Sequence, residues 1–85
     1  MSLTHGLSME MKKIIQGITE EPMDFETLSE RIEIVGPELN YYLVRMRKMG
    51  LVEYNEMNST VRLTEKGRQA AAELRTEQAM PQLPS

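Results

Sequence analysis

The side chains best suited to bind an anionic partner lie in the stretch LVRMRKMGLVEY. Arg45, Arg47 and Lys48 fall within four positions there, although the whole chain carries a net charge of −3. Residues 37–50 hold three basic side chains against one acidic side chain, whereas residues 1–36 hold three against seven. The positive charge of this segment could neutralise phosphate groups. Basic residues also suit the C-terminal end of any helix because of the helix dipole, so charge alone leaves a purely structural role open.

Other groups that could do chemistry are sparse. The chain has no cysteine and a single histidine, His5, so neither a disulfide nor a common transition-metal site is expected. A carboxylate cluster lies near the first predicted turn, but its spacing is not that of a calcium loop; its members are Glu20, Glu21, Asp24 and Glu26. We find no glycine-rich phosphate loop and no nucleophile paired with a base, so we predict no enzyme activity, no metal and no cofactor.

The periodicity of the apolar residues predicts four helices and one β-hairpin within a single domain. The expected caps are Ser8, Asp24 and Thr64, and Gly50 is expected to end the third helix in a left-handed conformation. Asn58 and Ser59 are expected to separate the two strands. The predicted elements are helices at 9–19, 25–32, 37–49 and 65–80 and strands at 51–57 and 60–64.

The third predicted helix has one apolar face and one basic face. Leu39, Tyr42, Leu43 and Met46 fall on the apolar face, which we expect to be buried together with Phe25, Leu28 and Ile32. The opposite face carries Pro37, Tyr41, Arg45 and Lys48, with Val44 at its margin. Among the eight methionines, Met11 and Met49 also fit core positions, whereas Met9, Met23 and Met80 are harder to bury.

Three segments together resemble one family. FETLSERI resembles the first helix of a helix-turn-helix motif, LNYYLVRMRKMGLVEY resembles its second helix and the strand that follows, and VRLTEKGRQAAAEL resembles a second wing strand leading into a helix. The chain thus resembles the winged helix-turn-helix domains of MarR-like and ArsR-like transcriptional regulators. The resemblance implies a mainly α fold with a small β-hairpin (α+β), in the order helix, helix, helix, strand, strand, helix. The domain would cover residues 7–79, between a flexible N-terminus, 1–6, and a flexible tail, 80–85.

The resemblance also implies a function. In such proteins the second helix of the motif enters the DNA major groove, so helix 37–49 would read double-stranded DNA. We expect a cytoplasmic, homodimeric, sequence-specific transcriptional regulator. The principal contacts would be Tyr41, Arg45 and Lys48, and the secondary contacts Asn40, Val44, Arg47 and Arg62.

An alternative is a winged-helix module that binds another protein and has little or no DNA affinity. The predicted hairpin tip, YNEMNSTVR, has no basic residue at its turn, and the chain is acidic and rich in methionine. The apolar runs are too short to cross a membrane, and the N-terminus has no signal-peptide pattern, so we expect no membrane association.

Overall fold

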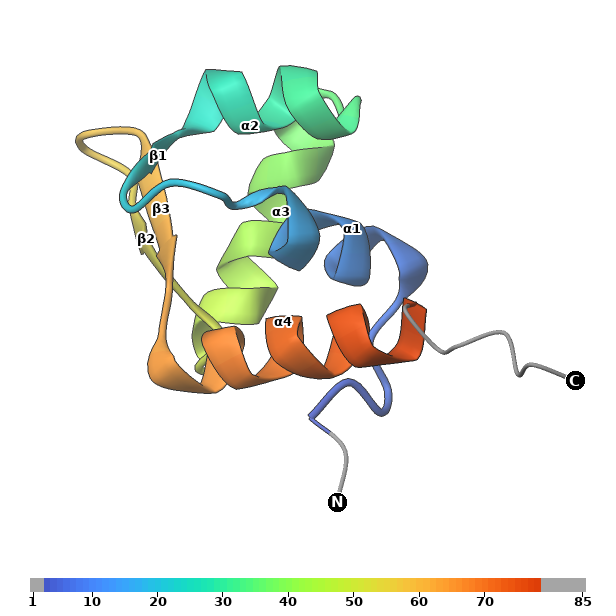
Figure 1. The fold of residues 1–85 in the computed structure, drawn as a ribbon. Coiled ribbons are helices and arrows are strands. Elements are labelled where there is room, and N and C mark those ends of the chain that lie inside the picture. The colour runs from blue at the N-terminus through green and yellow to red at the C-terminus, as the bar shows by residue number, and fades with distance from the viewer. Residues whose placement is uncertain (1–2, 79–85) are drawn as a thin grey trace, which may run out of the picture.

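The computed structural model describes residues 3–78, which form four helices and a three-stranded antiparallel sheet (Figure 1). The protein is therefore of the α+β class and mainly helical. The sheet has the strand order β1-β3-β2. The elements are α1 (Met9–Gly17), β1 (Met23–Asp24), α2 (Phe25–Ile32), α3 (Gly36–Lys48), β2 (Val52–Asn55), β3 (Thr60–Leu63) and α4 (Glu65–Gln78).

The predicted helix caps are confirmed. The Ser8 hydroxyl accepts a hydrogen bond from the Met11 amide at 3.1 Å at the start of α1. The Asp24 carboxylate accepts from two amides of the first turn of α2. The Thr64 hydroxyl accepts from the Gly67 amide at 3.0 Å at the start of α4. Each cap satisfies amide groups that have no partner within their own helix.

The end of α3 is set by Gly50, which has the predicted left-handed conformation with φ of 80°. The Gly50 amide donates to the Arg47 carbonyl, and the Leu51 amide donates to the Met46 carbonyl, both at 3.0 Å. These two bonds form a Schellman motif, which satisfies the last carbonyls of the helix. Leu51 and Met46 are both buried, so the turn that leads from α3 into β2 is anchored in the core.

Strand β1 was not predicted from the sequence. Met23 pairs with Val61 and Asp24 pairs with Thr60, so β3 is the central strand. Met23, which we considered hard to bury, is fully buried. A two-residue strand is too short to show an alternating pattern, and it forms here only because β3 supplies its hydrogen-bonding partner.

The core lies between the helices and the inner face of the sheet. Its fully buried larger side chains are Ile14, Ile15, Met23, Leu28, Leu39, Leu43, Met46, Leu51 and Val61. Met11 is buried as predicted. Phe25 and Tyr42 are only partly buried at the edge of the core, and Met49 is 39% exposed, so these three were wrongly placed in the interior. Met9 is exposed, and Met80 lies outside the described residues.

The hairpin turn is longer than predicted, because β2 ends at Asn55 and residues 56–59 form the turn. The Asn55 side chain accepts hydrogen bonds from the amides of Met57 and Asn58, and these local bonds replace the strand pairing that we expected. Helix α1 similarly ends at Gly17, two residues before the predicted end, because Ile18 adopts an extended conformation.

The ends of the domain were predicted to be flexible. Residues 3–6 form turns, Thr4 is buried, and the Leu3 amide donates to the Glu73 carboxylate at 3.0 Å. The predicted C-terminal tail, 80–85, lies outside the described residues. In the part of the chain that the structure describes, no helix combines the length and apolar character needed to cross a membrane.

Candidate nucleic-acid interface

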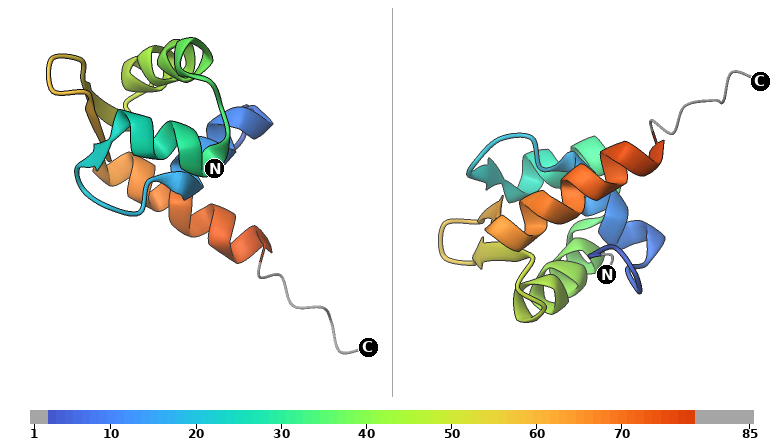
Figure 2. Two further views of the ribbon diagram at one scale, coloured as in Figure 1. Left: turned by 90° about the horizontal axis from the view of Figure 1, so that it is seen from above. Right: turned by 60° about the horizontal axis from the view of Figure 1, so that its bottom comes forward.

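Helix α3 is held by three fully buried side chains, Leu39, Leu43 and Met46. Since these side chains lie on one side of the helix, the opposite side faces away from the core. Seen from above in Figure 2, α3 lies at the edge of the molecule beside the β2–β3 hairpin. We call the exposed side of this helix, made of Tyr41, Val44, Arg45 and Lys48, the α3 outer face.

The α3 outer face combines an exposed aromatic ring with two cations. Tyr41 is 56% exposed, and the Arg45 guanidinium lies 5.5 Å from the centre of its ring, within the range of a cation–π contact. The Tyr42 ring meets Tyr41 edge-on at 5.3 Å between ring centres. Arg45 and Lys48 are exposed, and neither forms an ion pair with any residue between 3 and 78. The structure thus brings the three principal predicted contacts together on one surface.

Val44 is partly buried on the same outer face. It lies next to Arg45 and one helical turn before Lys48, and it offers a small apolar surface. Such a side chain can contact a thymine methyl group or an apolar side chain of a protein partner equally well.

Arg47 and Asn40, which we predicted as secondary contacts, turn away from the outer face toward the hairpin. The Arg47 guanidinium donates to the Tyr54 carbonyl at 3.1 Å and pairs with the Glu56 carboxylate at 3.4 Å. Asn40 accepts a hydrogen bond from the Tyr54 hydroxyl at 2.8 Å. Both residues therefore fasten α3 to β2 and the hairpin turn.

Tyr54 is the common partner of these contacts. Its ring stacks on Phe25 of α2 at 6.1 Å and lies 5.7 Å from the Arg47 guanidinium. Burial raises the pKa of Tyr54, and the nearby Glu56 carboxylate adds to this effect while Arg47 opposes it. This role of Tyr54 was not predicted, because nothing in the local sequence connects it to α3.

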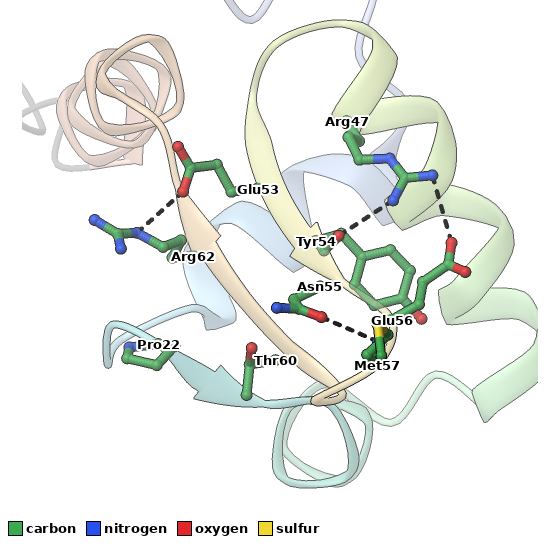
Figure 3. A pocket seen from close by; sticks show the side chains of 9 residues that line it. All are labelled: Pro22, Arg47, Glu53, Tyr54, Asn55, Glu56, Met57, Thr60 and Arg62. Carbon is green, nitrogen blue, oxygen red and sulfur yellow. Dashed lines mark hydrogen bonds and ion pairs between the residues drawn. The ribbon is translucent and has the colours of Figure 1, made fainter.

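Arg62 lies on β3, across the hairpin from α3. Its guanidinium pairs with the Glu53 carboxylate at 3.4 Å, as the cross-strand register of these two residues allows. Arg62 and Arg47 line the same shallow hollow on the outside of the hairpin, shown in Figure 3. Arg62 is thus part of this hollow rather than of the α3 outer face. The strand register brings Arg62 opposite Glu53, and this register was not available from the sequence alone.

The acidic groups lie mostly elsewhere on the surface. Glu38 is the one acidic residue of α3, in its first turn, where the helix dipole favours negative charge. Burial, followed by the charges of Glu10 and Glu38, raises the pKa of Tyr42.

Among residues 3–78 no three His, Cys, Asp or Glu side chains are grouped so that they could hold a metal ion.

Comparisons with protein-family models, with curated proteins and with solved structures gave no match to this chain.

Proposed function

We propose that this protein is a winged helix-turn-helix protein that binds double-stranded DNA in a sequence-specific way and regulates transcription. Helices α2 and α3 are the two helices of the motif, and the β2–β3 hairpin is the wing. The observation that carries the proposal is the α3 outer face, where Tyr41, Arg45 and Lys48 are exposed together and the two cations have no carboxylate partner in the described chain.

The outer face suits DNA for electrostatic and geometric reasons. An α-helix fits the major groove, and the exposed side of a helix anchored by its opposite side can reach base edges there. Arg45 and Lys48 neutralise phosphates or bond to guanine, and Tyr41 positions Arg45 through its ring. Because few cations are available and the net charge is −3, the affinity is modest, and it falls with added salt in proportion to the number of phosphates that are contacted.

The test is binding of the protein to a generic labelled duplex, measured by fluorescence anisotropy at low and at physiological salt. Replacing Arg45→Glu and Lys48→Glu together should weaken binding by roughly a hundredfold or more, because phosphate contacts are lost and repulsion replaces them. The control is the double variant Lys13→Glu and Arg75→Glu, which has the same net charge but changes exposed residues of α1 and α4. Equal losses in both variants would show that only total charge matters and would contradict the role of α3.

A second candidate is a module that docks to another protein. Met57 at the hairpin turn is 95% exposed and lies next to Glu56, so the tip of the wing is apolar and acidic rather than basic. Exposed tyrosine and arginine side chains, as on the α3 outer face, are also common anchors of protein interfaces. Absence of wild-type binding to DNA even at low salt would favour this second function.

A further inference from the structure

The Arg47 side chain is held in one place by three contacts with the hairpin. One guanidinium nitrogen donates to the Tyr54 carbonyl at 3.1 Å, and another pairs with Glu56 at 3.4 Å. The guanidinium carbon also lies 5.7 Å from the centre of the Tyr54 ring. Figure 3 shows the two polar contacts pointing from α3 toward β2 and the turn. Arg47 is therefore oriented before any ligand arrives, but its charge is balanced by a carboxylate.

The Arg47–Glu56 ion pair is weak enough for another anion to replace the Glu56 carboxylate. The two side chains are 42% and 54% exposed, so water and salt screen their attraction, and separating such a surface pair changes an equilibrium constant at most about fivefold. A phosphate group is a better partner for a guanidinium because it can accept two hydrogen bonds in parallel. The Tyr54 carbonyl would continue to orient the guanidinium after Glu56 has left.

We propose that Glu56 sets the strength of DNA binding, because its carboxylate competes with DNA phosphate for the Arg47 guanidinium. This inference rests on the proposed function. Arg47 is the neighbour of Lys48 in the chain and lies on the hairpin side of α3. A DNA backbone that runs along the outer face toward the hairpin would therefore contact Lys48 and then Arg47. With Glu56 present, the carboxylate keeps the guanidinium in most of the complexes, so Arg47 contacts phosphate in only a part of them. Generic DNA is therefore held weakly, and binding depends more on the contacts of Tyr41, Arg45 and Lys48.

The test compares Glu56→Gln with Glu20→Gln on a generic duplex over a range of salt concentrations. Both variants change the net charge by the same amount, and Glu20 is exposed without an ion pair in the described chain. Glu56→Gln should tighten binding roughly fivefold at low salt, and it should steepen the slope of log K against log salt by up to about 0.9, the value for one additional phosphate contact. Glu20→Gln should leave the slope as in the wild type.

A second pair of variants assigns the effect to Arg47. Arg47→Gln alone should weaken binding little, whereas in the Glu56→Gln background it should remove the whole gain of roughly fivefold. A gain that persists without Arg47, or a Glu56→Gln variant that behaves like Glu20→Gln, would overturn the inference while the wild type still binds DNA. If neither the wild type nor Glu56→Gln binds at low salt, the proposed function and this inference both fail. If the Glu56→Gln variant binds DNA and the wild type does not, the result would support competition between Glu56 and phosphate for Arg47.

Discussion

At the scale of single residues, Gly67 shows how closely α4 lies against the rest of the fold. A Cβ atom at this position would lie 2.1 Å from the Leu51 carbonyl oxygen and 3.2 Å from a methyl group of Leu63. The Leu51 carbonyl has little freedom to move, because it accepts a hydrogen bond from the Thr64 amide at 3.0 Å. The absence of a side chain at Gly67 therefore lets the start of α4 contact the start of β2.

We expect Gly67→Ala to lower the free energy of unfolding by about 2 kcal/mol, because overpacking outweighs the better helix propensity of alanine. Urea denaturation followed by circular dichroism measures the change. Gln69→Ala on the exposed side of the same helix is the control, and it should change stability by less than about 0.5 kcal/mol. A stabilised Gly67→Ala variant would show that α4 is not in close contact with Leu51.

At the scale of elements, the segment between α1 and β1 is tied to α4 by a charge pair. Arg68 donates two hydrogen bonds to the Glu21 carboxylate and also lies 3.8 Å from Glu65. The hydrogen bond from Arg68 lowers the pKa of Glu21 from its ordinary value of 4.5, with burial opposing and the positive charges of Arg68 and Arg62 assisting. The same bond raises the pKa of Arg68.

The lowered pKa predicts a pH dependence of stability. A carboxyl group whose pKa is lower in the folded state stabilises the fold above its unfolded pKa, and this contribution is lost as the pH falls through the folded pKa. Wild type should therefore be more stable than Glu21→Gln at neutral pH, and the difference should shrink as the pH falls below 4.5 and disappear below the lowered pKa of the folded state. Urea denaturation of both proteins across the acid range checks this, with Glu20→Gln as the control. A difference that is independent of pH would exclude the charge pair as its source.

At the scale of the whole molecule, the sequence predicted the features that depend on near neighbours. The caps at Ser8, Asp24 and Thr64 and the turn at Gly50 each follow from a few adjacent residues, and all four are confirmed. The outer face of α3 also follows from local periodicity, since Leu39, Leu43 and Met46 define its buried side.

The missed features join residues that are distant in the chain. Strand β1 needs β3, the Tyr54 hydroxyl needs Asn40, and the Arg68 guanidinium needs Glu21. Local propensity carries no information on such pairs, because they form only when the complete fold brings the segments together. For the same reason Arg47 and Arg62 were predicted as secondary DNA contacts without their carboxylate partners on the hairpin.

The central position of β3 determines what happens when the chain is cut at the β2–β3 turn. This strand pairs with β1 on one edge and with β2 on the other, and α4 follows it directly. A peptide that begins at Asn58 would carry β3 and α4, and its Val61, Leu63 and Leu74 would be left without a core of their own. A peptide that ends at Met57 would carry β1 and β2, the two strands between which β3 lies in the intact protein.

We therefore expect the fragments 1–57 and 58–85 to be largely unfolded when separate and to recover helical structure when mixed, as judged by circular dichroism and co-elution. A spectrum of the mixture equal to the sum of its parts would contradict this. If the fragments reassemble, the covalent chain can be cut at the hairpin turn without loss of the fold. The pairing of β3 with β1 and β2 then holds the two fragments together as one protein.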